Sequence, residues 1–188
     1  MRRASSVLAA LLAAVPAAAA DCKGTLYLTI DTGSMSQAEL IARTLAKHDV
    51  KATFFLANEK TVNGDRSLDP AWGPYWKARV AEGHAFGSHT WDHGYFRGDL
   101  PGGKVKYVVA GKPHELDAAG VCAELKRSEQ RFRELTGRGY DPIWRAPGGY
   151  TTPNAVAAAR ACGFEHVHWA PAGFLGDELP SDKYPNDV

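Results

Sequence analysis

Beyond its first twenty residues, the sequence has no apolar run long enough to cross a membrane. A spanning helix needs about 20 consecutive apolar residues. An excess of charge is missing too, because 22 Lys and Arg residues stand against 21 Asp and Glu residues. A chain so nearly neutral lacks the basic surface that binds nucleic acids or anionic membranes. We therefore expect no nucleic-acid partner and no stable membrane insertion.

The sequence also lacks linkers, low-complexity tracts and internal repeats that would divide residues 21–188. A stretch of this length fits one domain, and it can bury about two-thirds of the surface of its unfolded chain. We therefore predict one domain over residues 21–188.

Cysteine is scarce, with single residues at Cys22, Cys122 and Cys162. An odd number cannot pair completely, and the spacing matches no zinc module. Cys122 and Cys162 fall in segments that we predict to be helical. A disulfide between them is one interpretation, but we favour two small residues of the core.

The first twenty residues have the pattern of a secretory signal peptide. Arg2 and Arg3 form a basic start, Val7–Val15 is a short apolar core, and alanines lead to a cleavage position after Ala20. This interpretation is favoured over a buried N-terminal helix. Removal of residues 1–20 takes away two basic residues and no acidic one, which leaves a net charge of −1. We expect an exported protein, either periplasmic or secreted.

Segments rich in β-branched and aromatic residues alternate with segments of helical periodicity, which is typical of parallel βαβ units. Ser36 is expected to cap the first helix. Residues 95–113, rich in Gly and Pro, are expected to form a long loop with at most a local hairpin. We expect strands at 24–30, 50–57, 84–88, 142–145 and 164–169, and helices at 36–48, 70–82, 117–136 and 153–162.

Polar clusters follow three of these strands, at the carboxyl ends where α/β proteins place their chemistry. Asp31 ends the first strand just before Gly33, an arrangement that by itself is more often a simple turn. His89 and His93 follow the third strand. If that turn is helical, both imidazoles share a face and can bind one metal ion. Exposed histidine pairs also arise by chance, so this pair alone decides nothing.

The third cluster combines an arginine with a glycine-rich turn. Arg145 stands at the end of the fourth strand and precedes Pro147, Gly148 and Gly149. An arginine there can orient a carboxylate, while the turn offers free backbone N–H groups. The simpler alternative is an ordinary loop between a strand and a helix.

In their order and positions, the three clusters resemble the motifs of the polysaccharide deacetylase (NodB homology) family, carbohydrate esterase family four. Residues 29–33 are similar to its strand that ends in Asp-Asp-Gly. Residues 89–93 match its His-(Ser/Thr)-x-x-His motif, and residues 145–147 resemble its Arg-x-Pro motif. Trp169 and Asp177 are more loosely similar to a fourth segment.

The resemblance implies a distorted, incomplete (β/α) barrel that hydrolyses carbon–nitrogen bonds other than peptide bonds. Its substrate would be an N-acetylated polysaccharide, or an O-acetylated one, and its cofactor zinc or another divalent metal. Carried over to this sequence, His89 and His93 would bind the metal and Asp31 would be the general base. Arg145 would hold Asp31, and the N–H of Gly148 would bind the oxyanion.

Two positions depart from the family pattern. Thr32 stands where the family has its metal-binding aspartate, so it is a doubtful ligand. Zinc would then bind weakly, bind with Asp31 as a third ligand, or not bind. The chain also stops at Val188 without the family's late Leu-x-His segment. We therefore expect that the C-terminal strands and the general acid are missing.

Aromatic residues near the three motifs offer faces that could stack on sugar rings. We expect Trp91, Tyr150 and Trp169 to contact the substrate. The same residues fit an alternative function, a glycan-binding protein that keeps the deacetylase cleft without its catalysis. Zinc content distinguishes the two functions, because only the enzyme requires the metal.

Overall fold

The computed structural model describes residues 25–169 of the 188-residue chain. The signal peptide expected over residues 1–20, Asp177 and the chain end at Val188 lie outside the described residues. No helix within residues 25–169 is both long enough and apolar enough to cross a membrane.

A five-stranded parallel sheet forms the centre of the fold, in the order β1-β2-β3-β7-β8. This confirms the predicted α/β class with parallel βαβ units. Within the described residues the sheet stays open, with β1 and β8 at its edges, as in an incomplete barrel. The strands are β1 (Thr29–Asp31), β2 (Thr53–Leu56), β3 (Ala85–Ser88), β7 (Ile143–Trp144) and β8 (Glu165–His166).

The four predicted helices all form, and local signals explain most of their ends. The side chain of Asp117 accepts a hydrogen bond from the N–H of Gly120, and Gly137 ends the same helix with a left-handed φ of 82°. We had predicted that Ser36 caps the first helix, and this prediction was wrong. Gln37 occupies the N-cap position, without a capping hydrogen bond from its side chain. The helices are α1 (Ala38–Lys47), α2 (Gly73–Ala81, after a 3-10 turn at Pro70–Trp72), α3 (Ala118–Thr136) and α4 (Pro153–Ala161).

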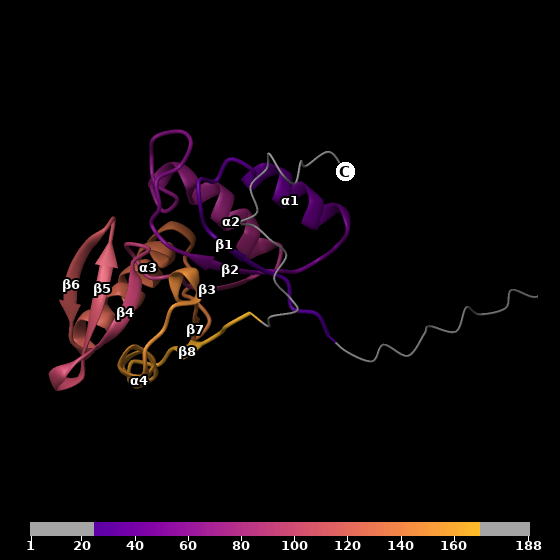
Figure 1. Cartoon of the computed structure of the whole chain (residues 1–188). Coiled ribbons are helices and arrows are strands. Elements are labelled where there is room, and N and C mark those ends of the chain that lie inside the picture. Colours follow the sequence, from indigo (N-terminus) through magenta and orange to yellow (C-terminus); the bar gives the residue numbers. More distant parts are fainter. Residues whose placement is uncertain (1–24, 170–188) are drawn as a thin grey trace, which may run out of the picture.

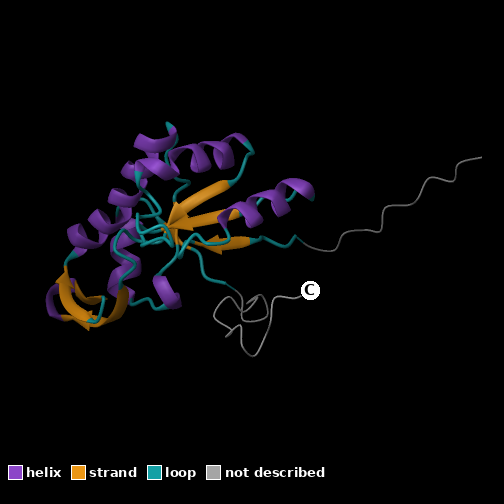
Figure 2. Ribbon diagram, turned by 90° about the horizontal axis from the view of Figure 1, so that it is seen from above, coloured by secondary structure: helices purple, strands orange, loops and turns teal. Residues whose placement is uncertain are grey.

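Aromatic rings fill the core between the sheet and its helices. Phe54 and Phe86 stack on neighbouring strands with centroids 5.9 Å apart. Trp76 of α2 and Phe132 of α3 meet Phe86 at 6.5 and 4.6 Å. Each of these four side chains is at most 3% exposed. The core therefore fixes the strands, and the loops that follow them gather at one end of the sheet (Figure 2).

The segment that we predicted as a long loop is a second, antiparallel sheet. It consists of β4 (Tyr95–Leu100), β5 (Lys104–Val109) and β6 (Lys112–Leu116), and it stands at one side of the molecule (Figure 1). Glycines at its turns misled the prediction, because tight turns between antiparallel strands need them. Gly102, Gly103 and Gly111 all adopt positive φ there.

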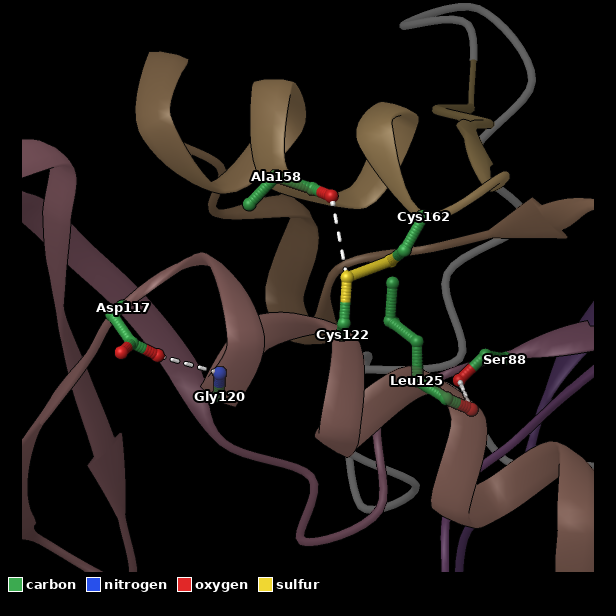
Figure 3. The surroundings of a disulfide bond; sticks show 7 residues. All are labelled: Ser88, Asp117, Gly120, Cys122, Leu125, Ala158 and Cys162. Carbon is green, nitrogen blue, oxygen red and sulfur yellow. Dashed lines mark hydrogen bonds between the residues drawn. A yellow bond between two sulfur atoms is a disulfide. The ribbon is translucent and has the colours of Figure 1, made fainter.

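The cysteine prediction was also wrong. Cys122 of α3 and Cys162 at the end of α4 form a disulfide, with their Cα atoms 6.0 Å apart (Figure 3). Forty residues separate them in sequence, so their pairing depends on how α3 and α4 pack, which no local pattern reveals. The bridge ties two helices that also share the buried cluster of Leu125, Ala155 and Ala159.

Candidate active site at the carboxyl ends of the strands

Asp31, at the end of β1, is held by Arg145, which follows β7. The Arg145 guanidinium donates from Nη1 to Asp31 Oδ1 at 3.1 Å and to the Thr29 hydroxyl at 2.8 Å. Its Nε donates to the Val167 carbonyl at 3.1 Å. Arg145 is only 3% exposed, so its bonds fix the guanidinium and, through it, one carboxylate oxygen. Burial raises the pKa of Asp31, although the Arg145 charge opposes that shift.

His89 follows β3 directly, and its ring orientation is set by the backbone. Its Nδ1 lies 2.8 Å from the carbonyl oxygen of Arg145. A carbonyl oxygen only accepts hydrogen bonds, so Nδ1 donates the proton, and in the neutral ring Nε2 carries the lone pair. That Nε2 lies 3.7 Å from Asp31 Oδ2. The arrangement is typical of metal-binding histidines, whose second nitrogen donates to a backbone carbonyl.

His93 reaches His89 by a different route from the helical turn considered above. Residues 89–94 form an irregular loop, in which Thr90 and His93 adopt positive φ values of 65° and 51°. The two imidazole rings nevertheless lie together, with centroids 4.9 Å apart. The loop therefore produces the proximity that the sequence spacing suggested.

A carboxylate that we did not predict, Glu59, stands beside this pair. It follows β2, and its Oε1 lies 3.8 Å from Nδ1 of His93. Its Oε2 accepts a hydrogen bond of 3.0 Å from the Thr32 hydroxyl. The same Thr32 oxygen accepts the backbone N–H of Ala57 at 2.9 Å. The Thr32 hydroxyl is thus engaged with the Glu59 carboxylate.

Charge and burial act strongly on these groups. Burial raises the pKa of Glu59 to about 7, and the charge of Asp31 adds to this, while the Thr32 hydrogen bond opposes it. Burial lowers the pKa of His93 to about 4, helped by His89 and opposed by Asp31. Two imidazoles and two carboxylates with such mutual influence form one electrostatic unit, as functional sites often do.

The donor set suits a divalent metal, although its geometry is open. Imidazole nitrogens and carboxylate oxygens are ordinary zinc ligands. Within residues 25–169, no three His, Cys, Asp or Glu side chains are already placed to hold an ion together. The closest nitrogen–oxygen pairs across the site, at 3.7 and 3.8 Å, are a few tenths of an ångström wider than the about 3.4 Å between ligands of tetrahedral zinc.

Aromatic groups line one side of the site. His93, Tyr95 and Tyr150 follow one another with ring centroids 5.8 and 6.1 Å apart. The guanidinium of Arg97 lies over both tyrosine rings, 4.7 and 4.3 Å from their centroids. Gly148 belongs here too, because a Cβ added to it would lie 2.8 Å from the Tyr95 ring. Tyr150 is 52% exposed, so part of its side chain reaches solvent beside Arg97.

The two other aromatic candidates have different surroundings. Trp169 lies close to Gly149, and the Arg145 guanidinium is 5.2 Å from its ring centroid, which places it at the site. Trp91 instead packs against the aromatic core and lies under Arg127 of α3, 4.3 Å from that guanidinium. The structure therefore brings Tyr150 and Trp169 to the site and engages Trp91 with the core.

The sequence model of the polysaccharide deacetylase family matches residues 18–167. The chain belongs to the polysaccharide deacetylase family. Within it, the chain is similar to a chitin deacetylase from Pestalotiopsis sp., with 31% identity over 139 residues that cover 71% of this chain and 36% of that protein.

Solved structures of a deacetylase and of a pseudoenzyme share the fold. One is the chitin deacetylase from Colletotrichum lindemuthianum, with a TM-score of 0.57 and 22% identity over 76% of this chain and 54% of that one. Another is a CE4 family pseudoenzyme from Bacillus anthracis, with a TM-score of 0.56 and 19% identity over 76% and 42% of the two chains. The chain spans less than half the length of the first curated relatives that it matches.

Sequence reasoning missed Glu59, Tyr95 and Arg97. Glu59 comes two residues after the predicted second strand, so the rule that pointed to the other three strand ends would have found it. Tyr95 and Arg97 lie on β4, in the segment that we predicted as a loop. Without the strand, nothing indicated that both side chains turn toward Tyr150.

Proposed function

We propose that this chain is an exported, metal-dependent hydrolase that removes acetyl groups from an N-acetylated polysaccharide. The observation that carries the proposal is the meeting of His89 and His93, which follow β3, with Asp31 at the end of β1, with His89 Nε2 lying 3.7 Å from the Asp31 carboxylate. Similarity to a chitin deacetylase and, over 69 residues, to a peptidoglycan-N-acetylglucosamine deacetylase from Listeria monocytogenes favours an amide substrate.

His89 and His93 would hold the ion, and Asp31 would accept the proton of the attacking water. A divalent ion, when bound, supplies Lewis acidity that polarises the acetyl carbonyl and acidifies water. Arg145 keeps Asp31 oriented through the 3.1 Å bond to Oδ1, which leaves Oδ2 on the His89 side. The backbone N–H of Gly148 would stabilise the oxyanion, a contribution of about 3 kcal/mol in other enzymes.

Two observations support the substrate and export parts of the proposal. The half-exposed Tyr150 and the ring of Trp169 flank the site and could stack on sugar rings. The disulfide between Cys122 and Cys162 fits an oxidising compartment, which agrees with a signal peptide over residues 1–20.

The second candidate function is glycan binding without catalysis. The observation that favours it is Thr32, which stands at the family's aspartate position and is engaged with Glu59 and Ala57. A protein of this kind would bind chitin oligosaccharides without zinc and release no acetate.

The test is acetate release from N-acetylated chitin oligosaccharides by the zinc-loaded full chain. We expect His89→Ala and His93→Ala each to abolish release, and the matched change His114→Ala, on the exposed β6, to leave it unchanged. Acetate release that persists in either site variant would refute the metal mechanism. Binding without any release by the unchanged chain would favour the second function.

A further inference from the structure

Thr32 stands where the family has a metal-binding aspartate, so this position supplies no negative charge to a bound metal ion. Two neutral histidines and a hydroxyl would give a divalent ion no compensating negative ligand. The Thr32 hydroxyl is also already used, because it accepts the Ala57 N–H and donates to Glu59. Thr32 is 9% exposed, so these two contacts hold its side chain in place. A metal site in this chain therefore needs its carboxylate from another residue.

Glu59 is placed to supply that carboxylate. Its backbone is fixed at both polar groups, since its N–H donates to the Ser67 hydroxyl at 3.1 Å and its carbonyl accepts the Ser67 N–H at 2.8 Å. Ser67 is fully buried, so the anchor is rigid. From there the carboxylate extends between the Thr32 hydroxyl, 3.0 Å from Oε2, and the His93 ring, 3.8 Å from Oε1.

We propose that Glu59 is the third metal ligand of this deacetylase, beside His89 and His93, and that Thr32 is a positioning residue that holds the Glu59 carboxylate. The proposal rests on the metal-dependent function proposed above. It relocates the negative ligand from the end of β1 to the end of the neighbouring strand β2. The longer Glu side chain covers the extra distance.

Asp31 is the competing ligand, and its contacts argue against it. Its Oδ1 is bound to the buried Arg145 guanidinium, a charge-assisted contact that would be weakened if Asp31 moved toward an ion. Within residues 25–169, the Glu59 carboxylate contacts a hydroxyl and an imidazole instead of a guanidinium. With Glu59 as the ligand, Asp31 remains available to take a proton.

Within the described residues no three such side chains are already placed to share an ion, so binding requires them to move closer together. Ligands of tetrahedral zinc lie about 3.4 Å apart, whereas Glu59 Oε1 and His93 Nδ1 are separated by 3.8 Å. The two imidazole rings already lie 4.9 Å apart between centroids. Binding would therefore draw together side chains that are already neighbours.

Calorimetric titration of Zn²⁺ into the metal-free full chain tests the assignment. We expect the unchanged chain to bind about one equivalent, and Glu59→Gln to weaken the affinity at least 10-fold, the lower end of what the loss of supporting groups costs in metal sites. Asp31→Asn should bind zinc within about threefold of the unchanged chain and lose acetate release. Glu39→Gln, on the exposed side of α1, is the matched control and should change neither measurement.

A second variant separates ligand loss from misfolding. Thr32→Asp introduced into Glu59→Gln returns a carboxylate to the β1 end, so it should recover zinc affinity. Zinc binding by Glu59→Gln equal to that of the unchanged chain would overturn the assignment while leaving the proposed function intact. An unchanged chain that binds no zinc and releases no acetate would overturn both.

Discussion

At the scale of single residues, Thr32 connects two strand ends through one oxygen atom. Its hydroxyl accepts the Ala57 N–H from the end of β2 and donates to Glu59. Because Ala57 is fully buried, its N–H has no water to replace Thr32. The side chain therefore contributes both to the stability of the fold and to the orientation of a carboxylate in the site.

Replacement of Thr32 by valine should separate these effects. Thr32→Val keeps the shape of the side chain but removes the hydroxyl, so we expect a loss of about 1–3 kcal/mol in the free energy of unfolding. We also expect zinc affinity to fall several-fold, because Glu59 loses its donor. Thr32→Ser keeps the hydroxyl and should restore most of both quantities, measured by urea denaturation and zinc titration. Equal zinc affinity in the valine and serine variants would contradict the positioning role.

The sequence predicted Asp31, His89, His93 and Arg145 because each belongs to a short motif next to a strand. The structure brings these four together. Glu59 belongs to no recognisable motif, and its role depends on the lateral pairing of β1 with β2, which sets Asp31 opposite Phe55. The strand-end rule would have singled out Glu59, but register between strands is a tertiary property, so the sequence could not show which side chains it meets.

At the scale of elements, the loop that carries both histidines is tied to the antiparallel sheet. The hydroxyl of Tyr107, on β5, accepts the Gly94 N–H at 3.0 Å and donates to Glu124 of α3 at 2.8 Å. Tyr107 is 2% exposed. Positive φ at Thr90 and His93 makes the loop an unusual backbone path. The sheet that sequence analysis took for a loop thus supports the candidate site.

Removal of this hydroxyl should loosen the histidine loop. Tyr107→Phe leaves the buried Gly94 N–H without its acceptor, so we expect the free energy of unfolding to fall by about 1–3 kcal/mol. Zinc affinity should fall as well, because His93 directly precedes Gly94. Tyr27→Phe, at an 80% exposed tyrosine, is the matched control. Urea unfolding and zinc titration measure the two effects. An unaltered zinc affinity in Tyr107→Phe would show that the sheet does not support the histidine loop.

Protonation of His166, on strand β8, should lower the stability of the fold at acidic pH. His166 Nε2 accepts the Ala146 N–H at 3.2 Å, which requires the neutral ring. Burial lowers the pKa of His166 to about 4, and the charges of His168 and Arg145 add to this. The unfolded state, with a pKa near 6.5, therefore binds more protons between pH 6.5 and 4. Stability should be fully present above pH 6.5 and fall as the pH drops toward 4.

The magnitude of this loss is about 1 kcal/mol, since solvent screens part of the shift at a partly exposed ring. Urea unfolding at pH 7.5, 6, 5 and 4 measures it, and an NMR titration of the imidazole protons gives the pKa directly. His166→Asn should show a shallower pH dependence than His114→Asn, which changes an exposed histidine. A His166 pKa above 6 would refute the assignment of burial as the cause.

Among the elements, the helices were predicted better than the antiparallel sheet β4–β6, because helices carry more local sequence signals. α3 shows a complete set of local signals, with a capping Asp117, an apolar stripe and a terminal Gly137. The β4–β6 sheet has two glycine-rich turns. Its buried side chains, Phe96, Val105 and Tyr107, are recognisable as such only in the folded protein, where they pack in one core cluster with residues of α3 and α4. Local composition resembles a loop there because tertiary contacts, not propensity, select the strands.

At the scale of the whole molecule, the Cys122–Cys162 disulfide links α3 to α4 and so holds the β7–β8 edge to the rest of the sheet. Closure of a loop of forty residues in the unfolded chain is worth about 4 kcal/mol in the chain-entropy treatment, and measured values are commonly 2–4 kcal/mol. Arg145 and His166 lie on or beside this edge, so the bridge restrains elements that orient the candidate base.

Conversion of both cysteines to serine should therefore destabilise the oxidised protein by about 3 kcal/mol. For a domain of this size that corresponds to a fall of about 10 °C in Tm. Thermal unfolding of Cys122→Ser/Cys162→Ser with and without a reducing agent measures it. Reduction should lower the Tm of the unchanged chain and leave the double variant unaffected. Because a bridge of this strength forms only under oxidising conditions, the chain produced in the cytoplasm should have the lower Tm until it is oxidised. If the reduced and oxidised chains melt together, the bridge contributes nothing to stability, and the support that it gives to export is lost.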